Sequence, residues 1–137
     1  MSTVVSFRLD EIEVERLRRA ARAMGRSPGE VAAVLVDEGL RLREFPGIEF
    51  RDTPVGRQAF LRGTRLGVWQ VAELVEAYAT TEATTGATIA AAAEHLGIAH
   101  ALVGLTTAYA RAFPAEIAAA TADARALNER LLATGER

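Results

Sequence analysis

The N-terminal segment, residues 4–9, constrains the fold more than any other part of the chain. Its side chains alternate between two faces of an expected strand, with Val5, Phe7 and Leu9 on the apolar face and Val4, Ser6 and Arg8 on the other. A helix begins directly afterwards at Asp10, and no second β-like run follows before Ile48. Because an unpaired strand is unstable, we expect the same segment of a second copy to pair with it antiparallel. The resulting two-stranded ribbon would fit the DNA major groove.

Two capped helices are predicted after this strand. Asp10 followed by Glu13 forms a capping-box pattern, and Gly25 stands where a helix ends in a left-handed residue. Ser27 and Pro28 supply an N-cap and an N1 proline for a second helix, which is expected to end near residues 43–44. We expect four apolar residues of this second helix to face inward: Val31, Val34, Leu35 and Leu42.

Residues 3–43 resemble a ribbon-helix-helix module, the DNA-binding fold of many bacterial repressors and antitoxins. The resemblance rests on the alternating strand, the two capped helices and the segment Gly25-Arg26-Ser27 between them. It implies a homodimer whose shared ribbon, exchanged between the two copies, enters the major groove. Residues 1–44 are therefore predicted to be a dimerisation and DNA-binding module.

The resemblance also implies which residues contact DNA. Val4, Ser6 and Arg8 would face the base edges, and an arginine suits guanine. Val4 departs from the polar residue that the family usually has at this position. The amide groups around Ser27 would bind a DNA phosphate. A ribbon that joins two copies without contacting DNA is the alternative.

Residues 45–137 are predicted to form a second module. Phe45-Pro46-Gly47 is expected to be a hinge. Strand-like runs at residues 48–51 and 59–62 flank a turn at residues 53–56 and predict a β-hairpin. A helix is expected to begin at Val68, where apolar residues recur at helical spacing.

Three more segments complete the predicted second module, a small β-hairpin plus a helical bundle, so the whole chain is expected to be mainly α with a short β component. The Thr/Ala-rich residues 79–88 are expected to be a flexible connector. Residues 89–96 and 100–111 flank Gly97 with the spacing of a helix-turn-helix, but the second helix lacks base-reading side chains, so we expect it to serve packing. The last helix begins at Pro114 and carries an apolar stripe of Ile117, Thr121, Ala124, Leu127 and Leu131. This stripe either closes the module's own core or docks on a partner.

Residues 48–112 resemble the DUF433 family. The resemblance rests on Asp52, Gly56-Arg57, Val68-Trp69 and the run Phe60-Leu61-Arg62-Gly63-Thr64-Arg65. The sequence departs from the family at Arg57 and in the Thr/Ala insertion. Fused to a ribbon-helix-helix module, such a domain is similar to VapB-like antitoxins of type II toxin–antitoxin pairs. The resemblance implies that residues 45–137 bind and neutralise a PIN-like ribonuclease toxin.

A PIN-like toxin would hold Mg²⁺ with clustered carboxylates, so an inhibitor can act by placing a guanidinium among them or by covering the cleft. The residues proposed for this contact are Arg62 and Arg65 in the turn, and Arg125, Leu127, Arg130 and Leu131 on the last helix. Arg62 and Arg65 capping backbone carbonyls of their own turn is the alternative.

Composition excludes several classes of function. The chain of 137 residues has no cysteine, and its two histidines, His95 and His100, have no third ligand nearby, so neither a disulfide framework nor a metal site is expected. No nucleophile elbow or phosphate-binding glycine loop occurs, so we expect neither an enzyme nor a cofactor. No apolar run reaches the length of a membrane span and the start is polar, which favours the cytoplasm.

Charge sets a limit on DNA binding. The chain has a formal net charge of −2; residues 1–44 carry eight arginines and eight acidic residues. DNA affinity must therefore come from the local placement of arginines rather than from a basic stripe.

Two functions remain: an antitoxin that binds a toxin and represses its own operon, or a stand-alone repressor whose second module assists oligomerisation or binds a ligand.

Overall fold

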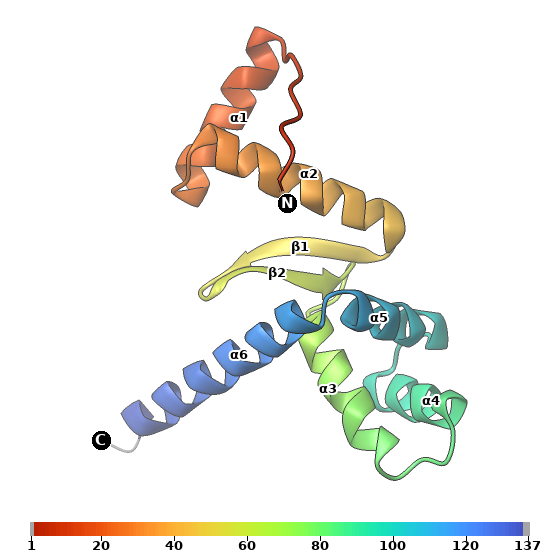
Figure 1. Cartoon of the computed structure of the whole chain (residues 1–137). Helices are drawn as coiled ribbons and strands as arrows, with labels where there is room; N and C mark the ends of the chain where they lie inside the picture. The colour runs from red at the N-terminus through yellow and green to blue at the C-terminus, as the bar shows by residue number, and fades with distance from the viewer. Residues whose placement is uncertain (1, 136–137) are drawn as a thin grey trace. The chain divides into compact units, whose positions relative to one another are not determined.

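The chain is mainly helical, with six helices and one two-stranded antiparallel sheet in the computed structural model, which describes residues 2–135 (Figure 1). This confirms the expected mainly α fold with a short β component. The chain divides into two units, residues 1–44 and residues 45–137.

The first unit contains a pair of helices whose ends are fixed by the predicted caps. Helix α1 spans Glu11–Met24, and the Asp10 carboxylate accepts a hydrogen bond from the Glu13 N–H at 2.8 Å. Gly25 ends this helix with φ of 63°, a left-handed conformation that glycine adopts without a steric penalty. Helix α2 spans Pro28–Glu44, and the Ser27 hydroxyl accepts from the Glu30 N–H at 3.2 Å.

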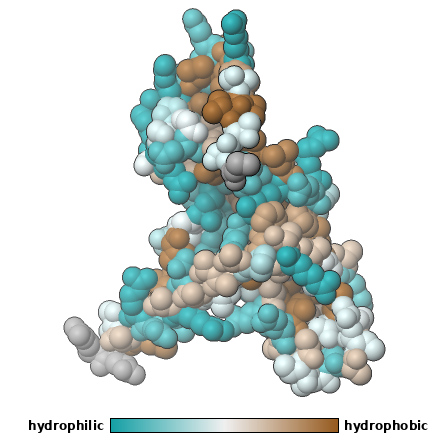
Figure 2. All heavy atoms as spheres, in the orientation of Figure 1, coloured by the Kyte–Doolittle hydropathy of each residue, from teal (hydrophilic) through white to brown (hydrophobic). Residues whose placement is uncertain are grey.

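Few side chains of the first unit are buried. Within residues 2–44 the buried residues are Ala21, Val31 and Glu38. Leu35 and Leu42, which were expected to face inward, are each 42% exposed. Figure 2 shows hydrophobic residues on the surface of this unit among hydrophilic ones. The two helices therefore leave much of their apolar surface in contact with water.

Residues 2–10 form neither helix nor strand in the single chain. The strand predicted over residues 4–9 is therefore not formed here. The physical reason is that a strand needs a neighbour for its backbone N–H and C=O groups, and the only sheet among the described residues lies in the second unit.

The second unit opens with the predicted β-hairpin. Strand β1 spans Ile48–Thr53 and pairs antiparallel with strand β2, Gly56–Leu61, with Ile48 opposite Leu61. The turn is held by Thr53, whose hydroxyl donates to the Gly56 carbonyl at 2.6 Å.

The predicted hinge, residues 45–47, follows directly after the boundary between the two units. Its first residue, Phe45, packs within the second unit: the ring lies edge-to-face on Tyr109, with 5.2 Å between centroids, and on Phe113 at 6.1 Å. These aromatic contacts hold Phe45 to the second unit.

Three helices follow the hairpin: α3 spans Val68–Ala79, α4 spans Thr85–Leu96 and α5 spans His100–Ala112. Residues 79–88 are not a continuous connector as predicted, because the first turn of α4 begins inside them. Thr84 is the N-cap, and its hydroxyl accepts from the Ala87 N–H at 3.1 Å. The chain bends by 114° between α4 and α5, which is within the range of helix-turn-helix pairs.

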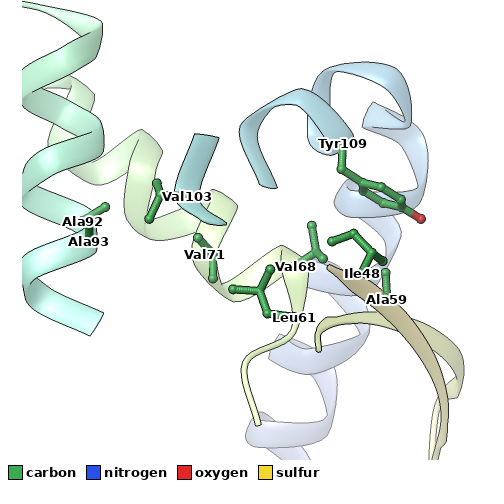
Figure 3. Packing of buried hydrophobic residues seen from close by; sticks show 9 residues of the cluster. All are labelled: Ile48, Ala59, Leu61, Val68, Val71, Ala92, Ala93, Val103 and Tyr109. Carbon is green, nitrogen blue, oxygen red and sulfur yellow. The ribbon is translucent and has the colours of Figure 1, made fainter. Parts of the chain in front are cut away.

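The core of the second unit is shared by the hairpin and these helices. At the start of α3, Val68 lies beside the hairpin residues Ile48, Ala59 and Leu61 (Figure 3). Farther along α3, Val71 lies near Val103 of α5 and on the side of Ala92 and Ala93 of α4. Tyr109 completes this buried cluster.

Helix α6 spans Pro114–Gly135 and begins at the predicted proline. Its 22 residues make it about 33 Å long, whereas the 12 residues of α3 give about 18 Å. Its first part packs against α3 and α5, and its second part extends away from the other helices of the unit (Figure 1). The burial of the predicted apolar stripe changes along the helix in the same way. Ile117, Thr121, Ala124 and Leu127 are half-buried, whereas Leu131, in the second part, is 64% exposed.

Candidate DNA- and partner-binding surfaces

The N-terminal segment lies against an open apolar groove of the first unit. Phe7 and Leu9 line this groove, whose volume is about 350 Å³. The remaining lining residues come from α1 and α2: Glu13, Arg16, Leu17, Ala20, Ala32, Leu35 and Val36. The groove thus joins Phe7 and Leu9 of the segment to both helices.

Val4, Ser6 and Arg8 are exposed and absent from the lining of that groove. Val5, which was predicted to lie on the apolar face with Phe7 and Leu9, is also 80% exposed and absent from the lining, so the predicted separation into two faces is seen only for residues 7–9. Among residues 2–135, the Arg8 guanidinium has no carboxylate partner within ion-pair distance.

Ser27 is used as a helix cap. Its hydroxyl donates to the Glu30 carboxylate at 2.9 Å while accepting from the Glu30 N–H. A phosphate at this position would lie close to the Glu30 carboxylate, whose negative charge opposes it. Arg26, directly before Ser27, is exposed and is the nearest residue along the chain that can offset this charge.

The turn after β2 presents two exposed arginines. Gly63 adopts φ of 74°, and the Thr64 hydroxyl donates to the Leu61 carbonyl at 2.8 Å and accepts from the Leu66 N–H at 3.0 Å. Thr64 therefore closes the turn. Within residues 2–135, the side chains of Arg62 and Arg65 form no hydrogen bond or ion pair, which contradicts the alternative that they cap the turn's carbonyls.

The candidate residues of α6 fall into two groups. Arg125 donates to the Glu73 carboxylate of α3 at 2.7 Å, and Leu127 is half-buried, so both hold α6 to the unit. Arg130 and Leu131 are exposed; Arg130 contacts the Ala126 carbonyl of its own helix at 3.4 Å. Only the second group is available to a partner without rearrangement.

A small pocket that the sequence did not indicate lies between the hairpin, α3 and α6. Its volume is about 140 Å³. Trp69 and Ile117 supply apolar lining, and Gln58 and Asp123 supply polar groups. The only sequence signal for it was the single tryptophan, which is half-buried.

The histidines show no sign of a metal centre. The Nδ1 atom of His95 lies 2.9 Å from the Tyr78 hydroxyl, so this ring is hydrogen-bonded to a neighbouring helix. In the part of the chain that the structure describes, no three histidine or acidic side chains converge in a way that could hold a metal ion.

No family model, curated protein or solved structure matches this chain. The resemblances to ribbon-helix-helix and DUF433 proteins therefore rest on the sequence motifs alone. Across residues 2–135, no single helix is both long and apolar enough to cross a membrane.

Proposed function

We propose that this chain is the antitoxin of a type II toxin–antitoxin pair. Residues 1–44 form a homodimeric ribbon-helix-helix module that enters the DNA major groove and represses the chain's own operon. Residues 45–137 bind and neutralise a PIN-like ribonuclease in the cytoplasm. The observation that carries the proposal is the unpaired segment 4–9, which places Phe7 and Leu9 at an open apolar groove and leaves Arg8 exposed.

A second copy would complete the first unit. Apolar residues exposed in the single chain include Val5, Phe7, Leu9 and Leu35, and a contiguous apolar surface is typical of an association site. Pairing residues 4–9 of two copies would satisfy their backbone N–H and C=O groups. The same pairing would cover the apolar groove of each of the two copies.

Arg8 is the proposed DNA-contacting arginine because of its place in the expected ribbon. On α1, Arg16 pairs with Glu13 at 2.8 Å and Arg22 with Glu15 at 3.4 Å, whereas Arg18 and Arg19 form no ion pair within residues 2–135, so ion pairing alone does not single out Arg8. The guanidinium of Arg8 is available for a guanine edge. Because the unit has no net charge, specific contacts of this kind must supply the affinity, and binding should weaken steeply with salt.

The second unit supplies the toxin-binding surfaces in this proposal. Arg62 and Arg65 are exposed and unpaired within the described residues, so their guanidinium groups can enter a cluster of carboxylates that would otherwise hold Mg²⁺. Arg130 and Leu131 lie on the extended part of α6 and can cover the rim of a cleft.

Toxin binding is tested by co-expressing the tagged chain with each open reading frame that neighbours its gene, scoring growth and co-purification. A toxic neighbour should be silenced and should co-purify. The double variant Arg62→Ala/Arg65→Ala should lose both effects, whereas Arg111→Ala, which removes an exposed arginine of α5, should keep them. If no neighbour is toxic and the chain purifies alone as a dimer, the antitoxin proposal fails and the stand-alone repressor replaces it.

DNA binding is tested separately by gel shift with the DNA upstream of the gene. Arg8→Ala should abolish the shift, and Arg43→Ala, which removes an exposed arginine from the last turn of α2, should retain it. An Arg8→Ala chain that binds as wild type would remove the ribbon from the proposal.

A further inference from the structure

An apolar residue stands on the face of the N-terminal segment that would meet DNA. Val4 is 93% exposed and alternates with Ser6 and Arg8 along the chain. Phe7 and Leu9 line the groove and Val4 does not; in the ribbon of the proposed function, Val4 shares with Ser6 and Arg8 the face opposite Phe7 and Leu9. At such exposure Val4 contributes nothing to the interior of the described unit, and its side chain can find apolar contact only outside the chain.

We infer that Val4 contacts the C5 methyl group of thymine, so that the DNA bound by this chain carries a thymine at each end of the ribbon. The inference rests on the proposed function of residues 1–44 as a dimeric ribbon in the major groove. In that groove thymine alone among the four bases presents a methyl group, and apolar side chains are the groups that contact it. Ser6 and Arg8 offer hydrogen bonds instead.

In the pairing register that the inference assumes, Val4 lies beside Arg8 of the second copy. With the two Ser6 residues facing each other on the two-fold axis, Val4 lies opposite Arg8 at both ends of the ribbon. This register separates the two Arg8 side chains by about 13 Å along the strands. An axis at Phe7 would bring them to about 7 Å, where like charges destabilise the pairing.

The register sets the base pattern. Opposed side chains are about 5 Å apart and successive bases rise by about 3.4 Å, so Val4 and Arg8 of the second copy reach the same or neighbouring base pairs. Each end of the ribbon therefore meets a thymine next to a guanine, since Arg8 suits guanine. The two ends lie about 13 Å, or about four base steps, apart. The expected box is a short palindrome with thymine and guanine at both ends.

The first experiment selects binding sites for the full-length chain from DNA duplexes randomised over about two helical turns, roughly 20 base pairs. Wild type should enrich thymine beside guanine at two places about four base pairs apart. The variant Val4→Ser, selected in parallel, should keep the guanines and lose the thymines. Serine is small and polar, so this variant changes the methyl contact without placing a bulky group on the ribbon.

The second experiment replaces both thymines of the selected duplex by uracil, which removes only the methyl groups. Burial of one such group changes affinity by a factor of about 4, so two should change it about 15-fold. Wild type should bind the uracil duplex more weakly by this factor, and Val4→Ser should bind both duplexes equally. Arg43→Ala, which removes an exposed arginine of α2 outside residues 4–9, is the control and should retain the full difference.

Two failures are distinguishable. If wild type binds with the expected dependence on Arg8 but does not discriminate thymine from uracil, the assignment of Val4 is wrong and the proposed function stands. If wild type enriches no duplex from the pool, and Arg8→Ala behaves in the same way, the DNA-binding function of residues 1–44 is itself overturned. Circular dichroism should show that each variant retains its helices.

Discussion

Replacing Phe7 by alanine tests whether a second copy completes the first unit. Phe7 is 61% exposed in the single chain and lines the groove with Leu17 and Leu35. A phenylalanine side chain has about 200 Å² of surface, so covering its exposed part in a dimer removes about 120 Å² from water. That is about 3 kcal/mol per copy and about 6 kcal/mol per dimer. The dimer dissociation constant should rise by about four orders of magnitude.

Sedimentation equilibrium over a concentration series measures this constant directly. Leu132→Ala is the matched control, because Leu132 has the same exposed fraction of 61% but lies on α6 of the second unit. This control should dimerise as wild type does. The reasoning is refuted if Phe7→Ala dimerises as tightly as wild type, or if wild type stays monomeric at its highest soluble concentration.

Five further substitutions test the packing, the caps and an ion pair. Leu61→Ala should destabilise the second unit by about 2–5 kcal/mol in urea unfolding, because Leu61 is fully buried; a loss below 1 kcal/mol would contradict the core described above. Gly97→Ala should cost about 1–2 kcal/mol because φ is 67°, whereas Gly104→Ala, whose added Cβ meets nothing within 4 Å, should raise the melting temperature by stabilising α5 by about 0.5–1 kcal/mol. Ser27→Ala should lower the thermal stability of the first unit by about 1 kcal/mol through loss of the α2 cap, and an unchanged melting curve would show that the cap contributes nothing. Arg125→Ala should cost less than about 1 kcal/mol in urea, since its ion pair with Glu73 is mostly exposed, and the difference from wild type should shrink in high salt.

Helix ends were predictable because their signals act over a few residues. The Asp10 cap, the left-handed Gly25 and the Ser27-Pro28 start all appear at the predicted positions. Each depends on a hydrogen bond or a backbone angle within one turn, which a short stretch of sequence specifies. The hairpin was predictable for a similar reason, since its turn lies directly between its strands.

Contacts between distant segments were not predictable from local sequence. Phe45 precedes a proline and a glycine, and its packing partners Tyr109 and Phe113 come much later in the chain. In residues 79–88 several threonines can each cap a helix, so the sequence alone did not single out Thr84. The alternation of threonine and alanine also gives little hydrophobic contrast from which a helical face can be identified.

The sequence predicted which arginines could contact a partner, but it did not predict which of them are already paired within the chain. The sequence proposed Arg62 and Arg65 from a motif and Arg125 from its place on the last helix, and the structure separates them. Arg62 and Arg65 are unpaired within residues 2–135, whereas Arg125 pairs with Glu73. That difference depends on how α6 crosses α3, and side-chain charge alone does not specify such a crossing.

The unpaired N-terminal segment would have a consequence for gene control in the proposed repressor. One chain supplies one half of the proposed ribbon, so the surface that would contact DNA exists only after two chains meet. While dimers are scarce, their number rises with the square of the free chain concentration. Halving the amount of free chain would then reduce the DNA-binding species about fourfold, so a partner or protease that removes single chains would relieve repression more than in proportion.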